Sequence, residues 1–203
     1  PITLPSHATL MTGRYPPGHG ARDNGVAVDA RVPTLAEAAK RAGLATAAFV
    51  AAYPLDHQFG LARGFDTYGD HLPRGRDGRL RNERPATDVA AEAITWLDTH
   101  RQQSFALWVH FFEPHAPYGD TASTPTGSAV ARYDEEIAIA DREAGRVIDA
   151  LGSAASSTLI VVAGDHGEAF GEHGEFGHSI FVYDTTLRVP LLMRGAGLTP
   201  RTV

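Results

Sequence analysis

Residues 164–179 read GDHGEAFGEHGEFGHS, and this stretch decides the predicted fold. It follows residues 158–163 (TLIVVA), a short β-branched run that is typical of a strand buried on both faces. Asp165 and His166 come directly after this run, where they can give one oxygen and one nitrogen ligand to a divalent cation. Ligands bind at the carboxyl ends of strands in open α/β sheets, so the sequence predicts a site at this edge. The alternative interpretation is a polar surface loop.

Helical and strand patterns alternate along the rest of the chain. The predicted helices cover about residues 5–12, 34–42, 85–100 and 133–151, and the predicted strands cover residues 45–51, 105–112, 158–163 and 189–193. Such alternation predicts a mostly parallel sheet with helices on both faces, which is a three-layer α/β/α sandwich.

The composition narrows the classes of function. With 203 residues, 43% of them hydrophobic, the chain is large enough for one domain with a proper core. A formal net charge of −6 argues against a nucleic-acid-binding protein, which normally carries a basic face. The absence of cysteine excludes disulfides, zinc–thiolate sites and thiol nucleophiles. No apolar run approaches the length of a membrane span, and the composition predicts no compartment.

Three more residues are candidates for a site because of where the predicted elements place them. Thr3 lies just ahead of the first helix, where free N–H groups and the helix dipole favour an anion; a simple capping role is the alternative. Asn24 lies in an Asp-Asn-Gly turn and is by default a turn-former. His115 lies between two prolines, just after the strand predicted at residues 105–112. A single histidine there would more often be structural, so its candidacy depends on the other polar residues at the same edge of the sheet.

Three separated segments together resemble the sulfatase-like branch of the alkaline phosphatase superfamily. Residues 3–7 (TLPSH), with Thr-Gly at residues 12–13, resemble its signature, and residues 113–118 (EPHAPY) resemble its central Asp-Pro-His-x-Pro-Tyr element. Residues 164–190, from GDHG to LRVP, resemble its metal-binding segment. The resemblance spans nearly the whole chain and implies an alkaline-phosphatase-like α/β/α sandwich.

The resemblance also implies roles for single residues. Thr3 falls where the family places its nucleophile and a metal ligand, and Asp165 and His166 match metal ligands. The nitrogen of His166 favours zinc or manganese over calcium, although the family often uses calcium or magnesium, so all four ions stay open.

The remaining matched residues contact the substrate in the family. His115 and His178 match groups that bind the tetrahedral anion or help the leaving group depart, and Asn24 matches an oxyanion-binding asparagine of phosphodiesterase-like relatives. His173 lies between matched segments, and we expect it to line or gate the site without binding metal.

Two residues depart from the sulfatase signature. Sulfatases need a cysteine or serine that is oxidised to formylglycine, and Thr3 does not readily supply that aldehyde. The arginine that supports the modified residue is replaced by His7. Both changes predict direct attack by a threonine alkoxide, as in the superfamily's phosphodiesterases and phosphotransferases.

The predicted function is therefore a metal-dependent hydrolase of small-molecule sulfate or phosphate esters. The alternatives are a phosphotransferase of the phosphoethanolamine-transferase type and a non-catalytic domain that retains the fold. No leader or strand precedes Pro1, so we expect residues 1–203 to be a single partial catalytic domain. We expect the first strand of that domain, which carries acidic ligands in the family, and its carboxyl-terminal segment to lie outside residues 1–203. An unpaired sheet edge would favour self-association.

Overall fold

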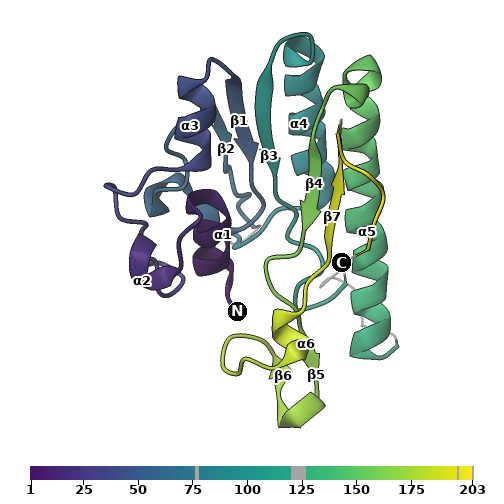
Figure 1. Cartoon of the computed structure of the whole chain (residues 1–203). Coiled ribbons are helices and arrows are strands. Elements are labelled where there is room, and N and C mark those ends of the chain that lie inside the picture. Colours follow the sequence, from purple (N-terminus) through teal and green to yellow (C-terminus); the bar gives the residue numbers. More distant parts are fainter. Residues whose placement is uncertain (76–77, 120–126, 196, 203) are drawn as a thin grey trace.

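A parallel sheet forms the centre of the computed structural model, which describes residues 1–75, 78–119, 127–195 and 197–202 (Figure 1). Strand β1 (Ala45–Phe49) lies between β2 (Thr67–Gly69) and β3 (Phe105–Val109), and both neighbours run parallel to it. The sheet combines small residues in β1 with aromatic residues such as Phe49, Phe105 and Trp108, which pack against the helical layers. It confirms the predicted α/β class.

Helices cover the sheet on both sides, as Figure 1 shows, with α3 on one side and α4 and α5 on the other. The helices are α1 (Thr3–Thr12), α2 (Pro16–His19), α3 (Leu35–Arg41), α4 (Ala86–His100), α5 (Ala129–Ala150) and α6 (Asp184–Leu187). Short 3-10 turns span Tyr53–Leu55, His57–Phe59, Gly152–Ser156 and Glu172–Gly174.

Two apolar clusters hold these layers together. In the first, Leu4 and Ala8 of α1 pack with Val50 and Trp108 on one face of the sheet. In the second, side chains of β1 pack against Val89, Ala93 and Leu97 of α4 on the other face. Because α1 is anchored through Leu4, its amino-terminal turn is fixed relative to the ends of the central strands.

The late strands form antiparallel pairs beside this sheet. Strand β4 (Ile160–Ala163) pairs with β7 (Leu191–Arg194), and β5 (Ala169–Phe170) pairs with β6 (Phe176–Gly177). The prediction that β4 is buried on both faces is wrong: Val161 is 51% exposed and Val162 is 41% exposed. Among the described residues β4 hydrogen-bonds as a strand only to β7, and the exposure of Val161 and Val162 shows that the layers around this pair cover its faces incompletely.

Several predicted boundaries shift by a few residues. Helix α1 begins at Thr3 rather than Pro5, because the extended Ile2 precedes a full helical turn that includes Thr3. Helix α5 begins four residues earlier than predicted, since the Ser128 side chain accepts a hydrogen bond from Ala131 N at 3.1 Å and caps it. Within the described residues, no helix combines the length and the apolar character that crossing a bilayer requires.

The exposed side chains of β4 and β7 predict self-association of this chain. Sedimentation velocity of residues 1–203 should show a sedimentation coefficient that rises with concentration. Val161→Lys and Leu192→Lys should suppress the rise, because a charge at an apolar strand face opposes its burial. The control Leu35→Lys changes a similarly exposed side chain on α3 and should have no effect. A native chain that stays monomeric at every concentration contradicts the prediction.

Candidate active site

Asp165 contacts both α1, which carries Thr3, and the loop that carries His166. Its Oδ2 atom lies 3.5 Å from Nδ1 of His7, on α1, and 3.5 Å from Nε2 of His166. Nδ1 of His7 also donates to the Thr3 carbonyl oxygen at 2.8 Å. The residue that carries the predicted nucleophile is therefore joined through His7 to the predicted metal ligands.

The donors of Asp165 and His166 fit a divalent cation. Nδ1 of His166 lies 2.9 Å from the Gly167 carbonyl oxygen, which can only accept, so this nitrogen carries the proton of the neutral ring. Its Nε2 lone pair then faces a carboxylate oxygen at 3.5 Å. Two ligands about 2.1 Å from a tetrahedral ion lie roughly 3.4 Å apart, so a cation between these atoms would satisfy both. Thr3 as a third ligand stays a prediction.

The predicted histidines gather around His166. The His178 ring lies 4.2 Å from the His166 ring and 5.3 Å from the His115 ring, measured between centroids. Nδ1 of His178 lies 3.1 Å from Oε1 of Glu168. Thus a single cluster contains four of the residues that the sequence predicted, although they come from two segments about fifty residues apart.

Asn24 lies at the amino-terminal end of α1. Its Oδ1 atom accepts a hydrogen bond from Leu4 N at 2.9 Å, which leaves the side-chain NH₂ group to face an anion beside Thr3. The prediction that free backbone N–H groups of α1 donate to an anion is wrong in part. Leu4 N already donates to Asn24, and Pro5 has no N–H. The Asn24 amide is exposed, and its role as an anion donor stays a prediction.

A buried carboxylate holds the loop that carries His115. Glu136 of α5 accepts from His115 N at 2.9 Å and from Gly119 N at 2.6 Å. The peptide bonds preceding Pro114 and Pro117 are both cis, and the His115 ring stacks on Phe112 with centroids 4.1 Å apart. Burial lowers the pKa of His115, so the ring is held neutral. The loop is thus fixed from outside the sheet by α5.

Burial also controls the charges around Asp165. Desolvation lowers the pKa of His7, and it lowers the pKa of His110 to about 3. The two rings touch, with centroids 4.8 Å apart. Burial alone would raise the pKa of the Asp165 carboxyl, but the imidazoles of His7, His166 and His110 outweigh it and hold the pKa below its usual value. Asp165 is therefore a carboxylate at neutral pH.

Close approach of two backbone segments explains Gly167. A Cβ atom at this position would lie 2.1 Å from the Thr185 carbonyl oxygen, and Gly167 N donates to Thr186 O at 2.9 Å. This contact docks the metal-binding loop on α6, with the Thr186 side chain fully buried beneath it. Glycine is thus required between His166 and Glu168.

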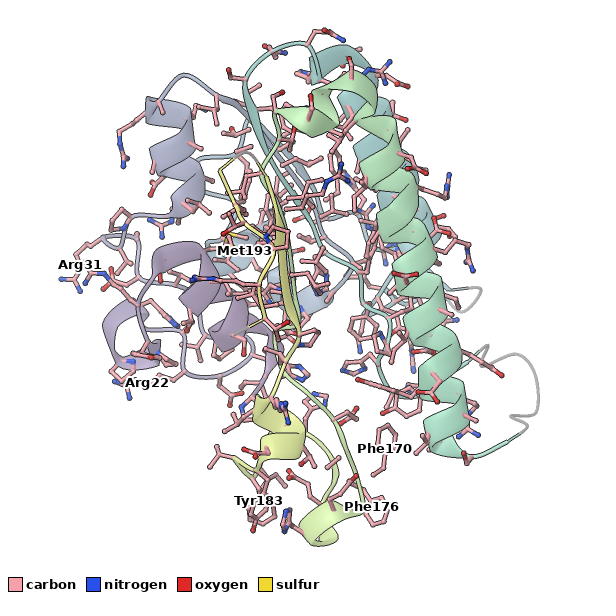
Figure 2. The ribbon with its side chains drawn as sticks, turned by 45° about the vertical axis from the view of Figure 1, so that its right-hand side comes forward. Arg22, Arg31, Phe170, Phe176, Tyr183 and Met193 are labelled. Atoms are coloured by element: carbon pink, nitrogen blue, oxygen red, sulfur yellow. The ribbon has the colours of Figure 1, made fainter. Side chains whose placement is uncertain are left out.

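His173 lies away from the cluster. It is exposed and stacks on Tyr183 with ring centroids 4.1 Å apart, so its predicted role in lining or gating the site stays a prediction. Figure 2 shows Tyr183 and Phe176 at the end of the molecule formed by the β5–β6 hairpin, whereas Phe170 faces the amino-terminal end of α5. Phe170 contacts Tyr133 of α5 there, with centroids 5.2 Å apart.

Sequence reasoning missed four residues of the site. His110, Glu136 and Glu168 were not singled out, and His7 was noted only as a departure from the signature. An acidic residue next to the Asp-His pair was the visible signal for Glu168. Nothing local marks Glu136, because its partners lie 17 and 21 residues away.

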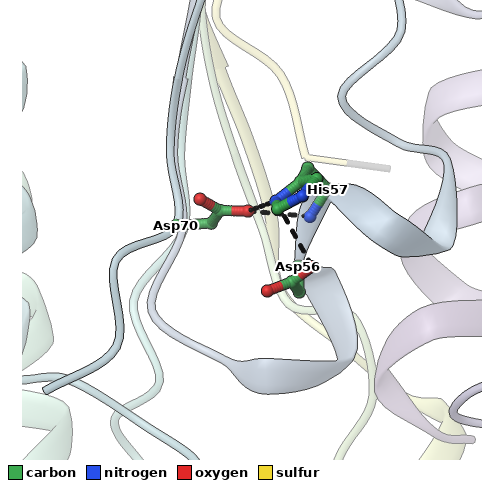
Figure 3. Close-up of side chains that lie close together, drawn as sticks. All are labelled: Asp56, His57 and Asp70. Carbon is green, nitrogen blue, oxygen red and sulfur yellow. Dashed lines mark hydrogen bonds and ion pairs between the residues drawn. The ribbon is translucent and has the colours of Figure 1, made fainter. Parts of the chain in front are cut away.

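A second cluster of acidic and histidine side chains lies outside this site (Figure 3). Asp56, His57 and Asp70 each offer a ligand atom, and these atoms lie within 4.8 Å of one another, a spacing that a cation can bridge. Their hydrogen bonds already pair them: Asp70 Oδ2 accepts from His57 N at 2.8 Å and lies 2.7 Å from His57 Nδ1. Asp56 Oδ1 accepts from Gln58 N at 2.9 Å.

The sequence profile described as Sulfatase matches residues 1–203. The chain belongs to the sulfatase family. A stretch of 106 residues, 51% of the chain, is 29% identical to iduronate 2-sulfatase of Mus musculus and covers 18% of that protein. The matched part thus spans less than a fifth of that relative.

Solved structures of sulfatases and phosphonate monoester hydrolases share the fold. A 2-O GAG sulfatase superposes with a TM-score of 0.78 at 18% identity, over 98% of this chain and 55% of its own. Phosphonate monoester hydrolase of Agrobacterium radiobacter superposes with a TM-score of 0.77 at 22% identity, over 97% of this chain and 59% of its own. The chain spans little more than half of these two proteins, and at such identities the likeness shows the fold alone.

The ion pair between His57 and Asp70 predicts a pH-dependent stability. The hydrogen bond to Asp70 raises the pKa of His57 above its unfolded value, so its stabilisation is present in full below the unfolded pKa and is lost as the pH rises through the folded pKa. Asp70→Asn should therefore lower the Tm more at about pH 5.5 than at about pH 9. The control Asp98→Asn removes an exposed pair with Arg101, and its effect should not change over this range. An equal loss at both pH values for Asp70→Asn contradicts the prediction.

Proposed function

We propose that this chain is the catalytic portion of a metal-dependent hydrolase of sulfate or phosphate esters, with Thr3 as the nucleophile. The observation that carries the proposal is the contact of Asp165 with both His7 and His166. Through this carboxylate, the α1 turn that begins with Thr3 and the predicted metal ligands lie in one site. The family to which the chain belongs supports ester hydrolysis at such a site.

Attack by Thr3 is the first chemical step of the proposal. Its Oγ atom forms a bond to the tetrahedral sulfur or phosphorus as the bond to the leaving oxygen breaks, and the hydroxyl proton passes to solvent. The Asn24 NH₂ group donates to a non-bridging oxygen. The Nδ1 hydrogen of His115 is directed to the Ala116 carbonyl oxygen at 2.6 Å, so His115 donates to the anion through Nε2 only when the bound anion draws a second proton onto the ring. His178 gives its Nε2 proton to the leaving oxygen. Water then attacks the Thr3 ester and gives a proton to His178, and the departing Thr3 oxygen takes a proton from solvent, which restores the free hydroxyl.

The metal is proposed to bind Asp165, His166 and Thr3. A divalent ion there would lower the pKa of the Thr3 hydroxyl and withdraw charge from the ester. The imidazole nitrogen favours zinc or manganese, with calcium and magnesium as the alternatives. The chain's own contribution is to hold Asp165 ionised and to direct Nδ1 of His166 to the Gly167 carbonyl oxygen, which leaves Nε2 on the side of Asp165.

The identity of residue 3 supports a phosphodiester preference. Threonine has no route to the formylglycine aldehyde, so direct attack by its alkoxide replaces the hydrate chemistry of sulfatases. The structural relatives include a 2-O GAG sulfatase and a phosphonate monoester hydrolase, so this fold is found in hydrolases of both sulfate and phosphonate esters. A small phosphate or sulfate ester is the proposed substrate class.

The test uses the longest natural polypeptide that contains residues 1–203, loaded in turn with zinc, manganese, calcium or magnesium. Hydrolysis of bis(p-nitrophenyl) phosphate should exceed that of p-nitrophenyl phosphate and p-nitrophenyl sulfate. Preference for the sulfate would overturn the inference from Thr3, and no hydrolysis with any ion would overturn the enzymatic assignment.

Variants of Thr3 test the nucleophile. Thr3→Val keeps the shape of the buried side chain but removes the hydroxyl, and it should lower kcat by at least about a thousandfold. Thr3→Ala should do the same, whereas Thr3→Ser retains a hydroxyl and should keep measurable turnover. A near-native rate for Thr3→Val excludes Thr3 as the nucleophile.

A further inference from the structure

A buried carboxylate stands behind the proposed general acid. Glu168 Oε1 lies 3.1 Å from Nδ1 of His178, and Glu168 Oε2 accepts from the Tyr118 hydroxyl at 2.7 Å. The Glu168 side chain is 5% exposed and that of His178 is 15% exposed. Both oxygens of one carboxylate are therefore used, one on an imidazole and one on a phenol.

The direction of both hydrogen bonds is fixed. Burial and the nearby Glu168 carboxylate raise the pKa of Tyr118, so its hydroxyl keeps its proton and donates. Burial would raise the pKa of Glu168, but its hydrogen bonds to His178 and Tyr118 outweigh this and lower it. Oε2 of Glu168 accepts from the Tyr118 hydroxyl, and Oε1, as a carboxylate oxygen, accepts from Nδ1 of His178.

The backbone on both sides also fixes this pair. Gly167 docks on the backbone at Thr185 and Thr186, which holds Glu168 in place. On the other side, His178 lies between Gly177 and Ser179, whose φ angles are 95° and 100°. A positive φ is uncommon for serine and indicates a loop whose conformation is imposed by its surroundings. The carboxylate and the imidazole are therefore held against each other by two separate turns.

We propose that Glu168 is a positioning residue whose hydrogen bond with Nδ1 orients the His178 imidazole so that Nε2 points to the leaving oxygen. Tyr118 holds the second oxygen of Glu168 and so sets the plane of the carboxylate. This inference rests on the proposed function, because it assigns a task to the neighbour of a proposed acid. It adds to that function a Tyr–Glu–His arrangement that spans the loops after β3 and β4.

If Glu168 orients His178, its loss should affect catalysis differently from a loss of structural stability. Proton donation matters when the departing oxygen is basic, and it matters little when the leaving group is stable as an anion. A loss of His178 orientation should therefore slow esters of alkyl alcohols much more than esters of p-nitrophenol. General folding damage would slow both to the same degree.

The experiment compares Glu168→Gln with the native enzyme in the longest natural polypeptide that contains this chain. The substrates are esters with p-nitrophenol, phenol and a simple alcohol as leaving groups. Gln keeps the size of Glu168 but removes its charge. We expect the p-nitrophenyl ester to retain kcat within about threefold and the alkyl ester to lose on the order of a hundredfold.

Three further variants make the comparison specific. Tyr118→Phe keeps the ring contacts with Tyr133 and should give a smaller loss in the same leaving-group order. In a His178→Ala background, Glu168→Gln should add no further loss, because the two residues act as a unit. Glu172→Gln changes an exposed acid of the same loop and should leave all rates unchanged.

The outcomes separate this inference from the proposed function. If the native enzyme turns over the substrates but Glu168→Gln slows all leaving groups equally, or slows none, Glu168 does not act through His178. Additive losses for Glu168→Gln and His178→Ala also overturn the inference. A native enzyme that hydrolyses none of the esters, with any of the four ions, overturns the proposed function itself.

Discussion

The site depends on the contact of one carboxylate with two imidazoles. Asp165 follows an edge of the late strand pair, His7 belongs to a helix that packs on the central sheet, and His166 belongs to the loop that docks on α6. Asp165 and His166 are neighbours in the chain, so the contact that joins distant parts of the molecule is the one between Asp165 and His7 of α1. A cation bound by Asp165 and His166 would lie at this junction. The helix that carries Thr3 is thereby placed against the ligand-bearing loop.

Much of this arrangement follows from patterns in the sequence. The strands before Glu113 and Asp165 end in polar residues, and the carboxyl ends of strands in an α/β fold meet at one edge, so the meeting of His115, His166 and His178 was predictable. Local patterns identified Asn24 only as a turn-former, and it was the resemblance to the family that paired it with Thr3; the hydrogen bond from Leu4 N to Asn24 now joins this turn to α1. Periodicity and the positions of glycine and proline predicted the elements, and the resemblance supplied the roles of the residues.

Other features depend on contacts between distant residues, and local patterns do not encode them. The link from Glu168 to Tyr118 spans 50 residues, and Glu136 lies on a helix whose pattern gives no sign that an acid faces the loop of His115. The exposure of β4 was also not predictable, because an apolar run in the sequence looks the same whether or not another layer covers the strand. The true start of α1 was missed because Pro5 suits a first turn but does not require it.

The two hydrogen bonds that Glu136 accepts from the His115 loop connect α5 to the site, although Glu136 itself contacts no reacting atom. One carboxylate holds two N–H groups of the His115 loop, so a displacement of α5 along its axis breaks both hydrogen bonds at once. The outer face of α5 is exposed, and a ligand that bound there with a preference for one position of the helix would shift the His115 loop with it. Helix α5 is thus the element through which a change outside the site would reach that loop.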